Sequence, residues 1–142
     1  MPTNLYTTDF YAWTQQQVAL LKSGKYANID FEHLAEEVED MGKSEKRTLE
    51  SRLEVLLMHL LKWQYQPAYR GKSWRLTIKE QRIRLAEHLQ DNPSLKSVLE
   101  DSINKAYKLA VIGAERETDL EVFPETCPYR IEQIFDSNYF PE

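Results

Sequence analysis

The sequence predicts an all-α fold, a compact single-domain bundle of about six helices over residues 1–142. Three observations lead to this prediction. Apolar residues recur three and four positions apart along most of the chain, which is the period of an amphipathic helix. No window shows the sustained alternation of valine, isoleucine and aromatic residues that is typical of a half-buried strand. Only four glycines and six prolines interrupt the 142 residues, so long regular segments are expected.

Glycines are expected to separate the first three helices. The first helix ends at Gly24, which suits a left-handed C-terminal cap, and Gln17 on its apolar face predicts a buried, hydrogen-bonded amide. The second begins at Asp30, a good N-cap, and ends at Gly42. The third begins at Ser44 and runs to about residue 64. Their apolar stripes are Phe10, Trp13, Leu20 and Leu21; then Phe31, Leu34, Val38 and Met41; then Leu49, Leu53, Leu56, Leu57, Leu60 and Leu61.

Prolines and capping residues delimit the last three predicted helices. Pro67 ends the third helix, because the residue before a proline avoids helical geometry. The fourth helix is expected to begin at Ser73 and the fifth at residues 92–93, an Asn-Pro pair typical of an N-cap and first turn. A short sixth helix is expected over residues 127–135. The inner face of the fifth helix becomes small toward its end, so another helix can approach closely there: Ala106, Ala110 and Gly113.

Composition excludes several classes of protein. The apolar fraction of 42% with 11% aromatics is that of an ordered globular chain. Cys127 is the only cysteine, so neither an intramolecular disulfide nor a thiolate zinc site can form, and a lone thiol suits a reducing cytosol. The sequence shows no signal peptide, and no stretch approaches the ~18 apolar residues of a membrane helix. We therefore expect a cytoplasmic protein that does not enter a membrane.

Charge is unevenly distributed along the chain. The formal net charge of −5 is modest, but residues 30–41 contain six acidic residues and no lysine or arginine. Residues 62–84 contain seven basic residues against the single acid Glu80. The tail from Glu115 onward is acidic again. This segregation is the feature most open to a functional interpretation.

The acidic segment is one candidate site. Its residues lie three or four positions apart, so pairs of them share a helix face: His33, Glu36, Glu37, Glu39 and Asp40. Paired carboxylates one turn apart can bind Mg²⁺ or Mn²⁺, and the run resembles one motif of the all-helical nucleotide pyrophosphatases. The second carboxylate motif of that family is missing, so a divalent ion would lack ligands. A solvated acidic face near a helix N-terminus is the simpler interpretation.

The basic segment is the other candidate site. Lys72, Arg75, Lys79 and Arg82 form one stripe of the fourth predicted helix, with Trp74 nearby. Cations beside aromatic rings suit phosphate contact and base stacking on single-stranded nucleic acid. The overall acidity argues against that function, because nucleic-acid modules usually carry a basic net charge. Pairing of this stripe with the acids of the second helix is the simpler interpretation.

Motifs of known catalytic sites are incomplete. Gly-Lys-Ser occurs at residues 42–44 and 71–73, but the second glycine and the preceding strand of a phosphate-binding loop are missing. His59, also considered as a metal ligand, interrupts an apolar helix face and is expected to be a hydrogen-bonded imidazole at the core. No orienting base is placed beside Cys127, which argues against a nucleophilic thiol. No catalytic residue is assigned.

Several ordered motifs resemble the bacterial family called domain of unknown function 29, which is common in cyanobacteria. The first is Tyr6-x-x-Asp9-Phe10-Tyr11-x-Trp13, and the others lie at residues 34–45, 59–67, 73–78, 92–95 and 123–128. The likeness covers essentially the whole chain. It implies a compact helical fold and a bacterial cytosolic setting, and it implies no activity.

The sequence therefore favours a non-catalytic protein-interaction module that presents charged faces to a protein partner or to a second copy of itself. No cofactor is expected. The first alternative is a hydrolase of phosphate esters or nucleotides that uses Mg²⁺ or Mn²⁺ on the acidic second helix. The second alternative is nucleic-acid binding through the basic fourth helix, which the net charge disfavours.

Overall fold

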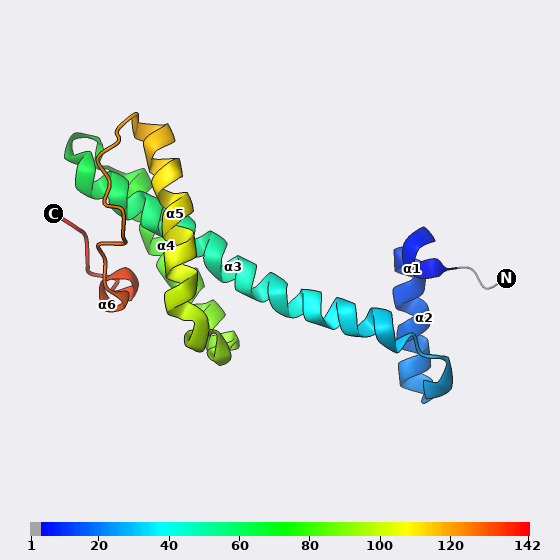
Figure 1. Cartoon of the computed structure of the whole chain (residues 1–142). Helices are drawn as coiled ribbons and strands as arrows, with labels where there is room; N and C mark the ends of the chain where they lie inside the picture. The colour runs from blue at the N-terminus through cyan, green and yellow to red at the C-terminus, as the bar shows by residue number, and fades with distance from the viewer. Residues whose placement is uncertain (1–3) are drawn as a thin grey trace. The chain divides into compact units, whose positions relative to one another are not determined.

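The computed structural model describes residues 4–142, and this part of the chain is all-α, as predicted. Short 3₁₀ segments lie at Tyr26–Asn28, Pro67–Tyr69 and Pro93–Val98. No helix among the described residues is long and apolar enough to cross a membrane. The α-helices of this part are α1 (Leu5–Thr8), α2 (Phe10–Ser23), α3 (Phe31–Tyr65), α4 (Lys72–Asp91), α5 (Leu99–Thr118) and α6 (Ile131–Phe135) (Figure 1).

By its internal contacts the chain divides into two compact units, with the boundary after Ser44. The first unit contains α1, α2 and the first turns of α3. The second contains the rest of α3 and helices α4 to α6. The prediction of one domain over residues 1–142 stays a prediction.

Helix α3 corrects the prediction of two helices separated at Gly42. The helix is continuous from Phe31 to Tyr65. A glycine inside a helix costs only about 1 kcal/mol relative to alanine, and an (i, i+4) ion pair offsets part of that cost. Lys43 Nζ lies 3.5 Å from Glu39 Oε1 in an (i, i+4) ion pair that spans Gly42. Ser44 therefore lies inside the helix and caps nothing.

Other predicted boundaries are confirmed in part. Gly24 ends α2 with a left-handed φ of 73°, and α3 ends at Tyr65, two residues before Pro67. Ser73 is not a cap, because α4 already begins at Lys72. The Asn92-Pro93 pair opens a 3₁₀ segment, and α5 begins only at Leu99. The sixth helix begins at Ile131, and the predicted cap Cys127 lies in the loop before it.

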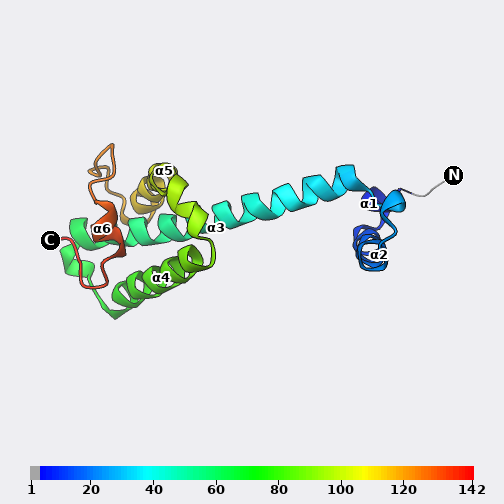
Figure 2. The same cartoon turned by 90° about the horizontal axis from the view of Figure 1, so that it is seen from below.

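The second unit contains the hydrophobic core. Figure 2 shows α5 on one side of the second half of α3 and α4 on the other. The six leucines of the predicted α3 stripe are fully buried, as expected for a central helix: Leu49, Leu53, Leu56, Leu57, Leu60 and Leu61. Ala106, Ala110 and Ala114 of α5 are buried, and a Cβ at Gly113 would lie 2.7 Å from Met58 Sδ. Small residues on α5 therefore allow the close approach that the sequence predicts.

Two arginines attach the C-terminal segment, residues 131–142, to the other helices of the second unit. Arg82 donates from Nε to the carbonyl of Ile134 at 2.8 Å and from Nη2 to that of Gln133 at 3.1 Å. These carbonyls belong to the last turn of α6, where a helix leaves its acceptors unpaired. Arg70 donates to the carbonyls of Trp63 and Glu142. Both side chains therefore satisfy backbone acceptors that the fold would otherwise leave free.

The leucine core predicts the effect of shortening one buried side chain of α3. Leu57→Ala should lower the free energy of unfolding by about 2–5 kcal/mol, because a fully buried leucine leaves a cavity. Urea denaturation followed by circular dichroism measures the loss. Leu109→Ala is the matched control, since that side chain is 53% exposed, and it should change stability by less than about 0.5 kcal/mol. Equal losses in the two variants would contradict this description of the core.

Candidate functional site

Asp30 is the centre of a hydrogen-bond network that joins α2 to the start of α3. Its Oδ2 accepts from Trp13 Nε1 at 3.1 Å and from His33 Nδ1 at 2.6 Å. Its Oδ1 accepts from the backbone N–H of His33 at 3.3 Å, which confirms the predicted N-cap. Its own backbone N–H donates to Gln17 Oε1 at 2.8 Å, and Gln17 is the predicted buried amide. One residue thus fixes the turn between the two helices.

Tyr6 of α1 packs its aromatic ring against this network. Its ring stacks on the His33 imidazole with centroids 3.9 Å apart and meets Trp13 edge-on at 4.9 Å. Its hydroxyl donates to Glu37 Oε1 at 2.5 Å. That hydrogen bond is the main reason why the pKa of Tyr6 rises to about 12. Tyr6 and Trp13 come from the first family-like motif, whereas nothing in the sequence indicated their partners on α3.

The Asp30–His33 pair shifts both pKa values in the directions expected of an ion pair. The hydrogen bond to Asp30 raises the pKa of His33, and the same bond lowers the pKa of Asp30. The His33 contribution to stability is present below its ordinary pKa and is lost as the pH rises through the raised pKa. The Asp30 contribution is present above its ordinary pKa and is lost as the pH falls through the lowered one. The ion pair therefore contributes most at a pH above the ordinary pKa of Asp30 and below the ordinary pKa of His33.

The first unit buries few large apolar side chains. Among residues 4–44 the only buried apolar side chains are those of Trp13 and Ile29. In the second predicted helix, Leu34 is half-buried and the rest of the apolar stripe is exposed: Phe31 at 62%, Val38 at 62% and Met41 at 66%. The predicted apolar stripe is therefore mostly exposed. The hydrogen bonds that join α3 to α1 and α2 come from Asp30 and from Glu37.

The exposed stripe has the spacing of a coiled-coil seam. Phe31, Leu34, Val38 and Met41 are separated by three, four and three residues; we call these four residues the α3 seam. Ala35 and Gly42 adjoin the seam, and nothing lies within 4 Å of a Cβ built on Gly42. The helical period places the exposed acids on the other side of the helix: Glu32, Glu36, Glu39 and Asp40. The seam is thus an apolar strip with room beside it.

The predicted metal ligands have separate partners. His33 is bonded to Asp30, Glu37 to Tyr6, and Glu39 pairs with Lys43. Glu36 and Asp40 are exposed. Within residues 4–142 no group of three or more histidine, cysteine, aspartate or glutamate side chains is placed to hold a metal ion. Mg²⁺ or Mn²⁺ binding by this helix stays a prediction.

His59 belongs to the second unit and is a half-buried imidazole at the edge of the core. Its Nδ1 donates to the carbonyl of Val55 at 2.8 Å, and burial lowers its pKa. The expectation of a hydrogen-bonded core histidine is confirmed.

The predicted basic stripe of α4 divides into exposed and buried members. Lys72, Arg75 and Lys79 are exposed, whereas Arg82 is buried. Trp74 is half-buried, with Lys62 Nζ 4.7 Å from the centre of its ring. The ion pair found within α4 joins Arg84 to Glu80 four residues earlier, and neither residue belongs to the stripe. Pairing of the stripe with the acids of the second predicted helix stays a prediction.

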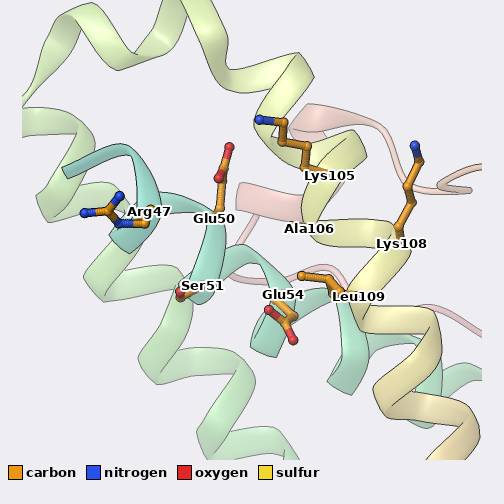
Figure 3. Close-up of a pocket in the computed structure, with 8 residues that line it drawn as sticks. All are labelled: Arg47, Glu50, Ser51, Glu54, Lys105, Ala106, Lys108 and Leu109. Atoms are coloured by element: carbon orange, nitrogen blue, oxygen red, sulfur yellow. The ribbon is translucent and has the colours of Figure 1, made fainter. Parts of the chain in front are cut away.

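Figure 3 shows a groove in the second unit between α3 and α5. It is lined by Arg47, Glu50 and Glu54 from α3 and by Lys105 and Lys108 from α5. The α3 wall thus carries both signs of charge, whereas the charged residues of the α5 wall are both lysines. Glu50 accepts from the fully buried Ser102 hydroxyl at 3.2 Å. The groove contains no histidine or cysteine, and its charges are those of two helices that pack against one another.

Three comparisons relate the chain to known proteins. A protein-family model described as "Domain of unknown function DUF29" matches residues 5–140. A search among curated proteins and a search among solved structures gave no match. The family match extends through both units, and it agrees with the resemblance carried by the motifs.

The Asp30–His33 geometry predicts a raised pKa for His33. In an NMR titration of the histidine ring protons, His33 should titrate above the ordinary value of about 6.5 and His59 below it. Asp30→Asn should lower the pKa of His33, because the amide removes the negative charge, and should leave His59 unchanged. A His33 pKa at or below the ordinary value in the unmodified protein would contradict the pairing.

Proposed function

Because the chain belongs to the DUF29 family, whose description assigns no activity, we propose its function from the structure: it is a non-catalytic interaction module. Its α3 seam binds an amphipathic helix of a protein partner. The single observation that supports this proposal is the exposure of the seam beside a hydrogen-bond network that already holds the first unit together.

Exposed apolar side chains usually mark an interaction surface when they are contiguous. Three seam residues are more than three-fifths exposed, although their spacing is that of a buried helix face. The 3-4-3 spacing suits a helix that inserts its own side chains between them. Ala35 and Gly42 beside the seam would let the backbone of that helix approach closely.

The polar groups of the first unit act in this proposal as a scaffold for the seam. Asp30 and His33 could serve as an acid–base pair, but both are engaged in holding helices together. Asp30 accepts from Trp13 and from the His33 backbone, and the His33 ring is covered on one face by Tyr6. The hydrolase and nucleic-acid alternatives have no comparable support and stay predictions.

If the α3 seam binds the partner, two substitutions within the seam should remove that binding. Val38→Ser with Met41→Ser should reduce the yield of a stoichiometric partner at least about tenfold in a pull-down from lysate of the source organism, because two central apolar contacts are removed. The matched control is Leu109→Ser with Ile112→Ser, an exposed pair with the same spacing on α5 of the second unit, which should retain the partner. Both variants should keep the stability of the unmodified protein.

Two outcomes would contradict the proposal. One is a monomeric mass in sedimentation together with no stoichiometric partner for the unmodified protein. The other is an equal loss of the partner in the seam variant and in the α5 control, which would place the interaction elsewhere.

A further inference from the structure

The second unit contains a basic pocket that the proposed function does not use. The pocket lies between α4 and the segment that follows α6, and it has a volume of about 430 Å³. Arg75, Lys79 and Arg82 line it from α4, and Ser137 and Asn138 line it from the C-terminal segment. No acidic residue is among its lining residues. Its size is that of a pocket for a small molecule.

Arg82, one of the residues that line this pocket, has a hydrogen-bond donor without a partner in the described part of the chain. The side chain is only 5% exposed, and its Nε and Nη2 are bonded to carbonyls of α6. Its Nη1 is buried and has no hydrogen-bond partner among the described residues. A buried donor without a partner is rare in folded proteins, and it commonly marks the place of a ligand or an ordered water molecule.

None of the positive charges around the pocket forms an ion pair within the part of the chain that the structure describes. The ion pairs found within residues 4–142 include none of Arg75, Lys79 and Arg82. The nearby Asp136 uses Oδ1 to accept from the backbone N–H of Asn138 at 2.9 Å. Three cations with no carboxylate in contact favour a ligand that carries more than one negative charge.

The lining residues indicate the chemistry of that ligand. Guanidinium groups present several donors in a planar fork that matches the oxygens of a phosphate group. The Ser137 hydroxyl and the Asn138 amide can donate to further oxygens. Leu76 and Phe140 complete the wall with apolar surface, which inorganic phosphate would leave uncovered. We propose that this pocket binds a small organic phosphate monoester, with its phosphate group at Arg75, Lys79 and Arg82.

This site is independent of the proposed function. The pocket is built from residues of the second unit alone, whereas the α3 seam belongs to the first. A failure of either proposal therefore leaves the other standing.

Titration calorimetry of the full chain with phenyl phosphate tests the pocket. The measurement is made at about pH 7.5, where a phosphate monoester is close to doubly charged, and at about 0.15 M salt, which screens distant charges. Arg75→Gln with Lys79→Gln should weaken binding at least tenfold. Both side chains are exposed, so the fold should survive, whereas a substitution of Arg82 would also release α6.

The matched control is Lys72→Gln with Arg84→Gln. It makes the same change in net charge on the same helix at positions outside the pocket, and it should alter the affinity less than twofold. Inorganic phosphate and benzoate should both bind more weakly than phenyl phosphate. Inorganic phosphate lacks the apolar ring, and benzoate lacks the phosphate group.

Four results would overturn the proposal. They are no binding of phenyl phosphate at millimolar concentration, equal weakening in the two double variants, benzoate binding as tightly as phenyl phosphate, and tighter binding of a single-stranded DNA oligonucleotide through Arg75 and Lys79. The last result would assign the basic face of α4 to nucleic acid.

Discussion

The carboxylate of Asp30 takes the place of a hydrophobic core in the first unit. It accepts from the Trp13 indole, from the His33 ring and from the His33 backbone. The backbone N–H of Asp30 donates to Oε1 of the buried Gln17. Such charge-assisted hydrogen bonds are stronger than neutral ones, and they are directional. They can fix the entry of α3 with only two large apolar side chains buried. Three of the four seam residues stay exposed beside this network: Phe31, Val38 and Met41.

The second unit is stabilised in the opposite way. Fully buried leucines of α3 pack with small residues of α5, so burial of apolar area dominates its stability. One buried polar side chain of this unit, Arg82, connects two helices. Arg82 binds the last carbonyls of α6, and its cost of burial is met in part by those hydrogen bonds. Its Nη1 remains unpaired within residues 4–142, and Arg82 lines the neighbouring pocket together with Arg75 and Lys79.

The sequence allowed the fold class and the core to be predicted, because these depend on periodicity and on local stop signals. Gly24, Asp30 and Pro67 act through backbone geometry within a few residues, and their roles were confirmed. Gly42 was misinterpreted because one glycine costs a helix only about 1 kcal/mol, too little to end a helix whose second half is held in the leucine core. The same limits apply to the sites. The exposure of Val38 depends on what packs against α3, and the burial of Arg82 depends on α6, 50 residues further along the chain. Neither follows from spacing on one helix.

The claim that a polar network organises the first unit is tested most directly by native-state hydrogen exchange of an Asp30→Ala variant. Amides of residues 10–23 and 31–40 should lose protection. The variant removes the carboxylate that accepts hydrogen bonds from Trp13 of α2 and from His33 of α3. Amides of residues 49–61 and 99–114, in the leucine core, should keep theirs. Unchanged protection of residues 10–23, or an equal loss throughout the chain, would contradict the account.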